Sequence, residues 1–279
     1  MLTFLEMGAK GRFGNQLFQL AALMGIAAWK GTSFRIPIEN THRDLARHAN
    51  RKTGNLEKSS LELHLAFALP RGWFAPRAEI LKVISSVYRE HRFGYDPEVV
   101  NVPDGSDISG YFQSERYFAH IAADVRSALA FHPPLRADAQ RNLTRIASGL
   151  PKVAIHVRRG DYLRLQNKFA VLPLAYYRQA MSMHSANGPC QFLVFSDDPE
   201  WCGEAFPGCR IVHSGSAHLD LCLMSMCDHF IIANSSFSWW GAWLSTAPNK
   251  NVVCPIQWWG PELTHNGVED LLPAGWLPI

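Results

Sequence analysis

A histidine, two arginines and an aspartate follow an apolar run near the middle of the chain, in the segment HVRRGD that begins at His156. Side chains alternate along a strand, so His156 and Arg158 point to one side and Arg159 to the other. The planar fork of Arg158 can bind a pyrophosphate and stabilise the negative charge that grows as a nucleoside diphosphate departs. Asp161 could hold Arg158 in place or act as a base, although a structural salt bridge uses the same residue types.

Two adjacent carboxylates, Asp197 and Asp198, end another apolar run in the segment FSDDP. Their spacing does not match the Asp-x-Asp pair with which a nucleotide-sugar enzyme can hold a divalent cation. They could form a turn or a helix cap, or they could hydrogen-bond a base or a ribose.

Small polar residues interrupt a long apolar stretch in the last quarter of the chain. A predicted strand leads into Asn234, Ser235, Ser236 and Phe237, and an aromatic-rich helix with three Trp residues begins there. Hydroxyls and free backbone N–H groups at the start of a helix suit a phosphate. The Trp residues are typical of a core.

The N-terminal loop from Gly8 to Gln16 spaces its glycines as G-x-x-G-x-x-G, which matches neither the dinucleotide-binding loop nor the phosphate loop. It places Arg12, Gly14 and Asn15 at the N-terminus of a predicted helix, where an anion is favoured. The alternative interpretation is a tight turn in which Asn15 caps the helix.

The elements that must position these residues are read from apolar periodicity. We predict strands over 2–7, 152–157, 191–195, 229–233 and 252–255, and helices over 17–29, 78–88, 115–131, 174–183 and 218–227, with a further helical segment between Pro134 and Gly149. Residues 96–110 are predicted to be turns, and residues 40–75 an irregular, Arg-rich segment. Strands separated by helices imply a parallel α/β sheet, which binds ligands at the carboxyl ends of its strands. We place a domain boundary at Pro151, which gives an N-terminal domain over 1–150 and a C-terminal domain over 151–279.

Composition narrows the class of protein. The chain has 279 residues, of which 47% are hydrophobic and 18% charged, with a formal net charge of +3, so a disordered or fibrous protein is excluded. Without a basic tract, a nucleic-acid partner has little support. The six cysteines form no Cys-x-x-Cys pair and are expected to be free thiols. The longest apolar stretch, 17–29, is too short to cross a bilayer, and no signal peptide is recognised, so we expect a cytoplasmic protein.

Four segments, GRFGNQLFQ, HVRRGDY, FSDD and CDHFIIANSSFSWWGAWL, occur in an order and spacing that resemble the bacterial alpha-1,2-fucosyltransferases of surface-polysaccharide and oligosaccharide synthesis. The resemblance implies an α/β, GT-B-like fold in which two Rossmann-like domains face a cleft. It implies a metal-independent, inverting enzyme without a resident cofactor, which moves L-fucose from GDP-β-L-fucose to the 2-hydroxyl of a galactose-terminated glycan. Transfer of another GDP-sugar, formation of another linkage, or a non-catalytic glycan-binding module are the alternatives.

The resemblance also assigns roles to the residues of the C-terminal half. Arg158 becomes the principal pyrophosphate ligand, with His156 near the nucleotide and Asp161 supporting the site. The residues expected to complete the GDP site are Asp197 or Asp198 for the guanine or ribose, Ser235 and Ser236 for the phosphates, and Asn234 and Phe237 for the shape of the same loop.

On the N-terminal side, Asn15 is expected to face the leaving group across the cleft, with Arg12 and Gly14 in the same loop. This loop differs from the GGLGNQ of many bacterial relatives, so acceptor preference does not carry over. The irregular segment 41–77 is expected to help select the acceptor. The basic surplus of residues 1–150 would attract a phosphorylated lipid-linked glycan or an acidic membrane surface, which allows peripheral membrane association.

Overall fold

The computed structural model describes residues 1–41 and 61–279. Most of the irregular segment expected over 40–75, and the corresponding part of the acceptor-selecting stretch, lies outside the described residues.

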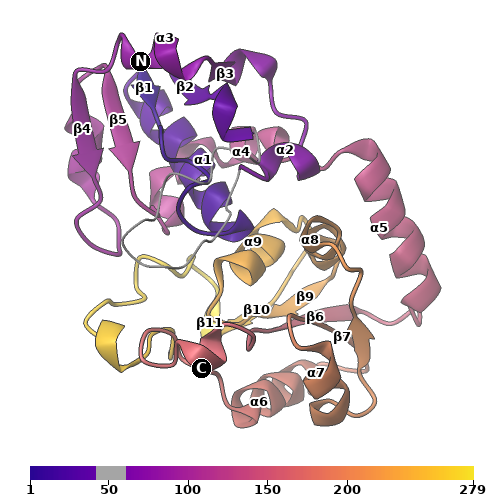
Figure 1. Ribbon diagram of the computed structural model, residues 1–279. Coiled ribbons are helices and arrows are strands. Elements are labelled where there is room, and N and C mark those ends of the chain that lie inside the picture. Colours follow the sequence, from indigo (N-terminus) through magenta and orange to yellow (C-terminus); the bar gives the residue numbers. More distant parts are fainter. Residues whose placement is uncertain (42–60) are drawn as a thin grey trace. The chain divides into compact units, whose positions relative to one another are not determined.

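The chain divides into two compact units (Figure 1). The first contains residues 1–131 and the short segment Glu269–Leu271, and the second contains residues 132–268 and 272–279. The chain passes between them at Phe131, ahead of the Pro151 boundary suggested by the sequence. The physical reason is that helix α5 (Pro133–Ile146) packs on α8 (Ala217–Ser225) of the second unit.

The first unit is built on a five-stranded parallel sheet in the order β3-β2-β1-β5-β4. Its strands are β1 (Leu2–Thr3), β2 (Phe34–Pro37), β3 (Phe74–Ala75), β4 (Ser86–Arg89) and β5 (Ser106–Ser109). Helix α1 (Phe13–Trp29) packs on β1 and β2 and is buried along most of its length. The short helices are α2 (Leu63–Ala66), α3 (Arg77–Leu81) and α4 (Ala122–Ala128).

Several predictions for this unit are wrong in extent. The predicted strand over 2–7 ends at Thr3, because the chain turns from Leu5 onward and Met7 N–H bonds to the carbonyl of Phe4. The predicted helix over 17–29 begins earlier, at Phe13.

Two further predicted helices form only in part. The one over 78–88 ends at Leu81 and gives way to β4, which pairs with β5 inside the stretch predicted as turns. The one over 115–131 contains two 3-10 turns before the short α4.

The second unit contains a six-stranded parallel sheet in the order β11-β10-β9-β6-β7-β8. Its strands are β6 (Lys152–Val157), β7 (Gln191–Ser196), β8 (Arg210–Val212), β9 (His229–Ile231), β10 (Val252–Cys254) and β11 (Leu277–Pro278). From the centre of the sheet, β6, β7 and β8 follow one another toward one edge, and β9, β10 and β11 follow one another toward the other edge. This is the arrangement of a doubly wound nucleotide-binding sheet. The predicted strands at 152, 191, 229 and 252 are confirmed, while β8 and β11 were not predicted.

Helices cover both faces of this sheet. The helices α6 (Leu174–Ser185) and α7 (Pro199–Ala205) lie on one face, and α8 and α9 (Ser236–Leu244) on the other (Figure 1). Val153, Ile155 and Val157 of β6 belong to one buried core cluster together with Tyr177 of α6. By alternation, His156 faces the opposite side. All six cysteines are free thiols, as predicted.

Candidate functional site

Three neighbouring strands end beside one another and deliver the polar segments of the second unit. In the sheet, His156 of β6 lies opposite Phe195 of β7, and Ile155 lies opposite Ile231 of β9. The residues that follow these strands therefore meet at one edge, the carboxyl edge where parallel sheets bind ligands. Because β6 and β9 lie at the point where the strand order reverses, this is also the usual position of a nucleotide.

Arg158 lies at the centre of this edge, held by two carboxylates. Its Nη2 is 2.5 Å from Asp161 Oδ1 and its Nη1 is 2.8 Å from Asp197 Oδ2. The guanidinium carbon lies 5.3 Å from the centre of the Tyr162 ring. Since only 16% of the Arg158 side chain is exposed, its position is fixed before any ligand arrives. A fixed cation at a strand end is suited to bind an anion.

Asp197 also holds the turn that carries Arg158. Its Oδ1 accepts the N–H of Arg159 at 2.9 Å and the N–H of Gly160 at 3.3 Å. A Cβ atom at residue 160 would lie 2.6 Å from Asp197 Oδ2, so only glycine allows this approach.

Arg159 is turned away from Arg158 and serves a different contact. Its Nε lies 3.0 Å from Asp198 Oδ2, and its guanidinium stacks 3.8 Å from the Trp201 ring. Asp198 Oδ1 accepts the N–H of Trp201 at 3.3 Å and so caps α7. The helix-cap interpretation of the FSDD segment is therefore correct for Asp198.

His156 is 5% exposed and its ring lies 5.3 Å from that of Phe237. Burial, and then the positive charge of Arg158, lower the pKa of His156 to about 3. The imidazole is therefore neutral at physiological pH. Its buried Nδ1 has no hydrogen-bond partner among the described residues, so it can act as a neutral hydrogen-bonding group.

Asn234 anchors the loop that follows β9 through hydrogen bonds to neighbouring loops. Its Nδ2 donates to the carbonyls of Ala170 at 2.9 Å and Trp258 at 2.7 Å, and its own carbonyl accepts the Tyr162 hydroxyl at 3.0 Å. This arrangement ties the loops that follow β6, β9 and β10 to one another.

Helix α9 begins directly after this loop. Ser235 is its N-cap residue, in an extended conformation, and the Ser235 side chain makes no capping bond. Within residues 1–41 and 61–279, the backbone N–H groups of Ser236 and Phe237 have no acceptor. Unbonded N–H groups at a helix N-terminus attract anions, and Arg158 supplies the cation on the neighbouring strand end.

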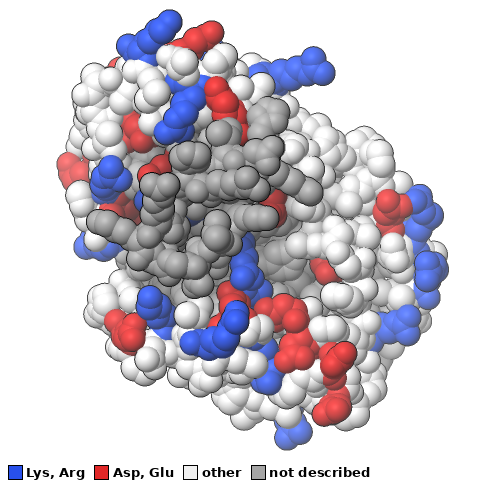
Figure 2. Space-filling view, viewed as in Figure 1, with Lys and Arg blue, Asp and Glu red and all other residues white. Residues whose placement is uncertain are grey.

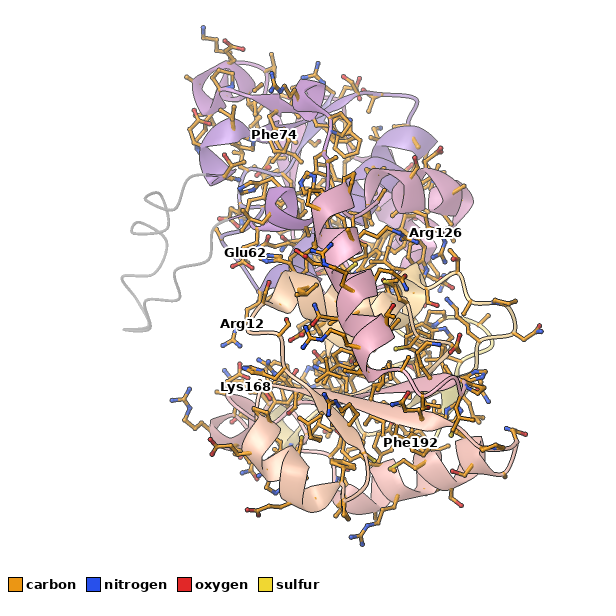
Figure 3. The ribbon with its side chains drawn as sticks, turned by 90° about the vertical axis from the view of Figure 1, so that its right-hand side faces the viewer. Arg12, Glu62, Phe74, Arg126, Lys168 and Phe192 are labelled. Atoms are coloured by element: carbon orange, nitrogen blue, oxygen red, sulfur yellow. The ribbon has the colours of Figure 1, made fainter. Side chains whose placement is uncertain are left out.

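The predicted residues of the N-terminal loop belong to the first unit. Asn15 does not cap α1, because it lies inside the first turn and the N-cap residue is Arg12. Its Oδ1 instead accepts the Gln113 side chain at 2.7 Å, and Gly11 gives it room. Arg12 is exposed just before α1 (Figure 3), and Gly14 is buried within that helix.

Sequence reasoning missed three contributors to the second unit's edge: Gly160, Tyr162 and Trp201. The first two are part of the HVRRGDY segment, so their place in the motif is the signal that could have singled them out. Nothing in the sequence pairs Trp201 with Arg159.

The described residues hold neither a cluster of metal ligands nor a helix suited to span a membrane. Within residues 1–41 and 61–279, no three His, Cys, Asp or Glu side chains gather as metal ligands. Over the same part of the chain, none of the helices combines the length and apolar character needed to span a bilayer. Basic and acidic side chains are interspersed over the visible face (Figure 2).

The chain matches glycosyl transferase family 11 over residues 3–276. It belongs to that family. Among the relatives of this family 11 chain, an alpha-1,2-colitosyltransferase of Escherichia coli is 27% identical, with the alignment covering 96% of each protein. A galactoside alpha-(1,2)-fucosyltransferase 1 of Ateles belzebuth is 30% identical over 84% of this chain.

The family 11 chain spans less than two thirds of some of these relatives. The alignment covers 63% of the Ateles protein, and 44% of the O-antigen biosynthesis glycosyltransferase WbnK of Escherichia coli, which is 40% identical over 136 residues.

Solved structures share the fold at low identity. POFUT1 in complex with GDP superposes with a TM-score of 0.55 at 12% identity, covering 91% of this chain and 97% of that one. NodZ alpha-1,6-fucosyltransferase superposes with a TM-score of 0.53 at 15% identity, covering 89% and 93%. The family 11 chain therefore has the α/β fold with parallel sheets of these GT-B-like proteins.

Proposed function

We propose that this family 11 chain is an inverting galactoside alpha-1,2-fucosyltransferase, which moves L-fucose from GDP-β-L-fucose to the 2-hydroxyl of a terminal galactoside. The observation that carries the proposal is the fixed guanidinium of Arg158 beside the unbonded N–H groups at the start of α9. This pair of features suits the pyrophosphate of a nucleotide sugar. The names of the family 11 relatives supply the sugar and the linkage.

In this proposal the second unit holds the donor. Arg158 binds the pyrophosphate, while Ser235 and Ser236 offer hydroxyls to the phosphates and Ser236 and Phe237 offer their backbone N–H groups. Phe237 and the neutral His156 shape the same pocket. Asp161 and Asp197 act on the donor through Arg158, which they hold in place.

In this proposal the first unit holds the acceptor. Its contribution to the reaction comes from Asn15, in the loop that also contains Arg12 and Gly14. The contact between Gln113 and Asn15 keeps the Asn15 carboxamide in one orientation.

Transfer needs no covalent intermediate. The acceptor oxygen attacks the anomeric carbon as the bond to the diphosphate breaks, so the β-linked donor gives an α-linked product. In an oxocarbenium-like transition state the departing diphosphate gains negative charge. Arg158 and the α9 N–H groups, already oriented, stabilise that charge more than they stabilise the bound donor.

We propose that the reaction needs no metal ion. The two aspartates best placed beside a diphosphate, Asp197 and Asp198, already form ion pairs with Arg158 and Arg159. The arginines thus supply the positive charge that a divalent cation would otherwise contribute.

The proposed setting is the cytoplasmic face of a bacterial membrane, where the enzyme extends a surface polysaccharide or oligosaccharide before export. WbnK carries the name of an O-antigen biosynthesis glycosyltransferase. The basic surplus of residues 1–150 would favour peripheral association with an anionic membrane surface.

A second donor has a specific observation in its favour. The alpha-1,2-colitosyltransferase aligns with 96% of this chain. Colitose is fucose without the 3-hydroxyl, so a GDP-colitose donor would keep the same diphosphate contacts and lose one hydrogen-bonding group.

The test is a transfer assay with GDP-fucose, GDP-colitose and GDP-mannose, each with β-galactoside acceptors and with or without EDTA. We expect transfer from GDP-fucose and unchanged rates in EDTA. Preferred use of GDP-colitose would establish the second candidate. Calorimetry with GDP separates both from a glycan-binding module, because a protein that binds galactosides but not GDP is no transferase.

A further inference from the structure

The outer edge of the first unit's sheet exposes large apolar side chains. Strand β4 is the outermost strand at this edge (Figure 1). Leu81, Val83 and Val87, which lead from the end of α3 into β4, are 51%, 51% and 52% exposed. Among the large apolar side chains of the described residues, only Ile256 is more exposed, at 60%. The most exposed apolar side chains of the first unit therefore lie close together in the sequence.

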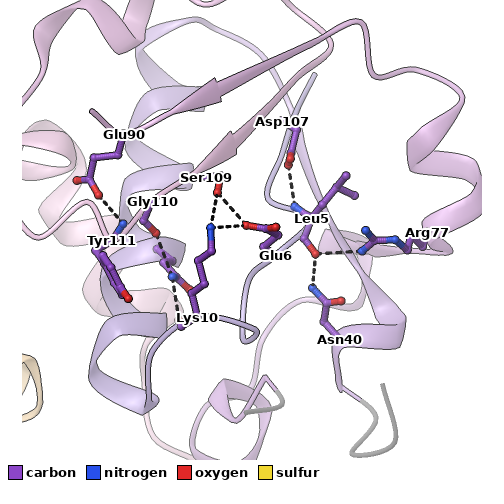
Figure 4. A network of polar contacts seen from close by, with 11 residues as sticks. Leu5, Glu6, Lys10, Asn40, Arg77, Glu90, Asp107, Ser109, Gly110 and Tyr111 are labelled. Carbon is purple, nitrogen blue, oxygen red and sulfur yellow. Dashed lines mark hydrogen bonds and ion pairs between the residues drawn. The ribbon is translucent and has the colours of Figure 1, made fainter. Parts of the chain in front are cut away.

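The exposed side chain of β4 lies on the same face of the sheet as α3. Helix α1 joins β1 to β2, and α3 joins β3 to β4 in the opposite direction across the sheet, so right-handed crossovers place these helices on opposite faces. Val87 lies opposite Asp107 in the register of β4 with β5, so both side chains point to one face. Asp107 accepts the N–H of Leu5, whose carbonyl accepts from Arg77 of α3 (Figure 4). Val87 thus points to the face of α3, which leaves the outer strand uncovered.

Three exposed cations, Lys82, Arg89 and Arg92, lie among these apolar side chains. Lys82 separates two of the apolar residues in the sequence. Arg89 lies two positions after Val87 in β4 and therefore points to the same face. In the described part of the chain, no carboxylate lies within ion-pair distance of any of the three.

The carboxylates near these cations compensate little of their charge. Glu79 is the one exposed carboxylate of residues 77–92. Glu90 is turned inward, where it accepts two backbone N–H groups at 2.6 and 2.9 Å. Asp104, beside the loop that precedes β4, pairs with the N-terminal ammonium at 3.3 Å. The surface therefore carries a net positive charge together with its apolar side chains.

We propose that this surface binds an anionic membrane. Its members, together called the β4 surface, are Leu81, Lys82, Val83, Val87, Arg89 and Arg92. Stable peripheral binding needs two contributions, apolar side chains that enter the interface and cations that attract acidic headgroups, and the β4 surface supplies both. A protein interface instead gathers its apolar side chains at a centre depleted in charge. The proposal rests on the proposed function for its setting, and it gives the peripheral association a location.

The test measures binding of the chain to vesicles of phosphatidylcholine, with and without phosphatidylglycerol. One variant replaces the three cations of the β4 surface by glutamine. Its matched control replaces three exposed arginines of the second unit, Arg145, Arg178 and Arg210, so both proteins lose the same charge. We expect the affinity of the variant for anionic vesicles to fall on the order of 100-fold, since each cation near an anionic surface contributes about fivefold. The control should lose less than about threefold, because charges distant from the surface are screened.

A second variant, Leu81→Gln with Val83→Thr and Val87→Thr, tests the apolar contribution. Threonine keeps the branched shape that suits a strand, so β4 should form as before. Affinity for anionic vesicles should fall by about tenfold or more, because fewer methyl groups enter the bilayer. Ile256→Thr, at the most exposed large apolar side chain, is the control and should bind as the wild type does. All variants should keep the wild-type melting temperature.

The outcomes separate the membrane from other occupants and from the transfer reaction. Wild-type binding that does not depend on phosphatidylglycerol, or variants that bind as their controls do, would overturn the proposal. So would a concentration-dependent dimer that the apolar variant abolishes while the wild type ignores vesicles, because a second copy would then cover the β4 surface. Transfer to a soluble β-galactoside should be unchanged in both variants. A wild type that binds anionic vesicles but transfers no sugar would remove the proposed function and leave the membrane surface standing.

Discussion

The carboxylate of Asp197 joins the side chain of Arg158, 2.8 Å away, to the backbone of the turn that carries it. One oxygen binds the guanidinium and the other binds two consecutive N–H groups of that turn. The cation at the end of β6 is therefore oriented by a residue from the end of β7. Such an arrangement lowers the reorganisation needed when charge develops on a bound diphosphate.

Replacement of Arg158 by Ala should lower kcat by on the order of 100-fold or more, because a charge-assisted contact to the leaving group is lost. Arg158→Lys should recover only part of this, since an ammonium lacks the planar fork. Arg145→Ala, at an exposed position of α5, serves as the control. Steady-state kinetics measure kcat of each variant. Near-normal turnover by Arg158→Ala would refute the role assigned to Arg158.

Gly160→Ala should weaken GDP binding by about tenfold or more, because its Cβ would lie 2.6 Å from Asp197 Oδ2 and the carboxylate would have to move. Gly203→Ala in α7 is the matched control, since no atom lies within 4 Å of its Cβ position. That control should keep wild-type affinity and gain up to about 1 kcal/mol of stability from helix propensity. Calorimetric titration with GDP measures the affinity of each variant. Equal affinities of the two variants would contradict the packing argument.

His156 should make stability depend on pH in the acid range. Its pKa is about 3 in the folded protein, against an ordinary 6.5, so the unfolded chain binds the extra proton between these values. Stability is present above about pH 6.5 and is lost as the pH falls toward 3, by about 2 kcal/mol between pH 7 and pH 5. In urea unfolding, the free energy of unfolding of the wild type should fall relative to that of His156→Gln as the pH is lowered over that interval. A constant difference between the two proteins would mean that His156 is not buried neutral.

Glu90 should give stability the opposite dependence on pH. Burial raises its pKa from 4.5 to about 7, although the N–H groups of Tyr111 and Phe112 partly oppose the shift. The folded protein then holds the proton that the unfolded chain has lost, so this contribution is present below about pH 4.5 and disappears as the pH rises through 7. Glu90→Gln should therefore gain stability relative to the wild type between pH 5 and pH 8. The same unfolding series measures it, and a gain in the reverse direction would disprove the assignment.

The second unit could be predicted from sequence because its strands are short apolar runs buried on both faces. Lys152–Val157 is observed with the predicted bounds, and the polar segments that follow the runs lie at the carboxyl edge as expected. The pairs made there were not predictable. Which of two adjacent aspartates would bind Arg158 depends on the register of β6 against β7, not on composition.

The first unit was harder to predict from the sequence because its strands are defined by contacts between residues distant in sequence. The strands β4 (SVYR) and β5 (SDIS) carry little apolar periodicity, and pairing with each other and with β1 defines them as strands. The residues after β1 look like a continuing strand, yet side chains distant in sequence stabilise a turn there. Asp107 accepts the N–H of Leu5, and Asn40 and Arg77 donate to its carbonyl (Figure 4).

The most direct test of the central claim is linkage analysis of the product formed from GDP-fucose and a panel of β-galactosides. The purified product would be examined by nuclear magnetic resonance. We expect fucose in α linkage to the 2-hydroxyl of the terminal galactose, with GDP released in equal amount. Fucose on another hydroxyl, a β linkage, or no transfer alongside intact GDP binding would contradict the proposed function.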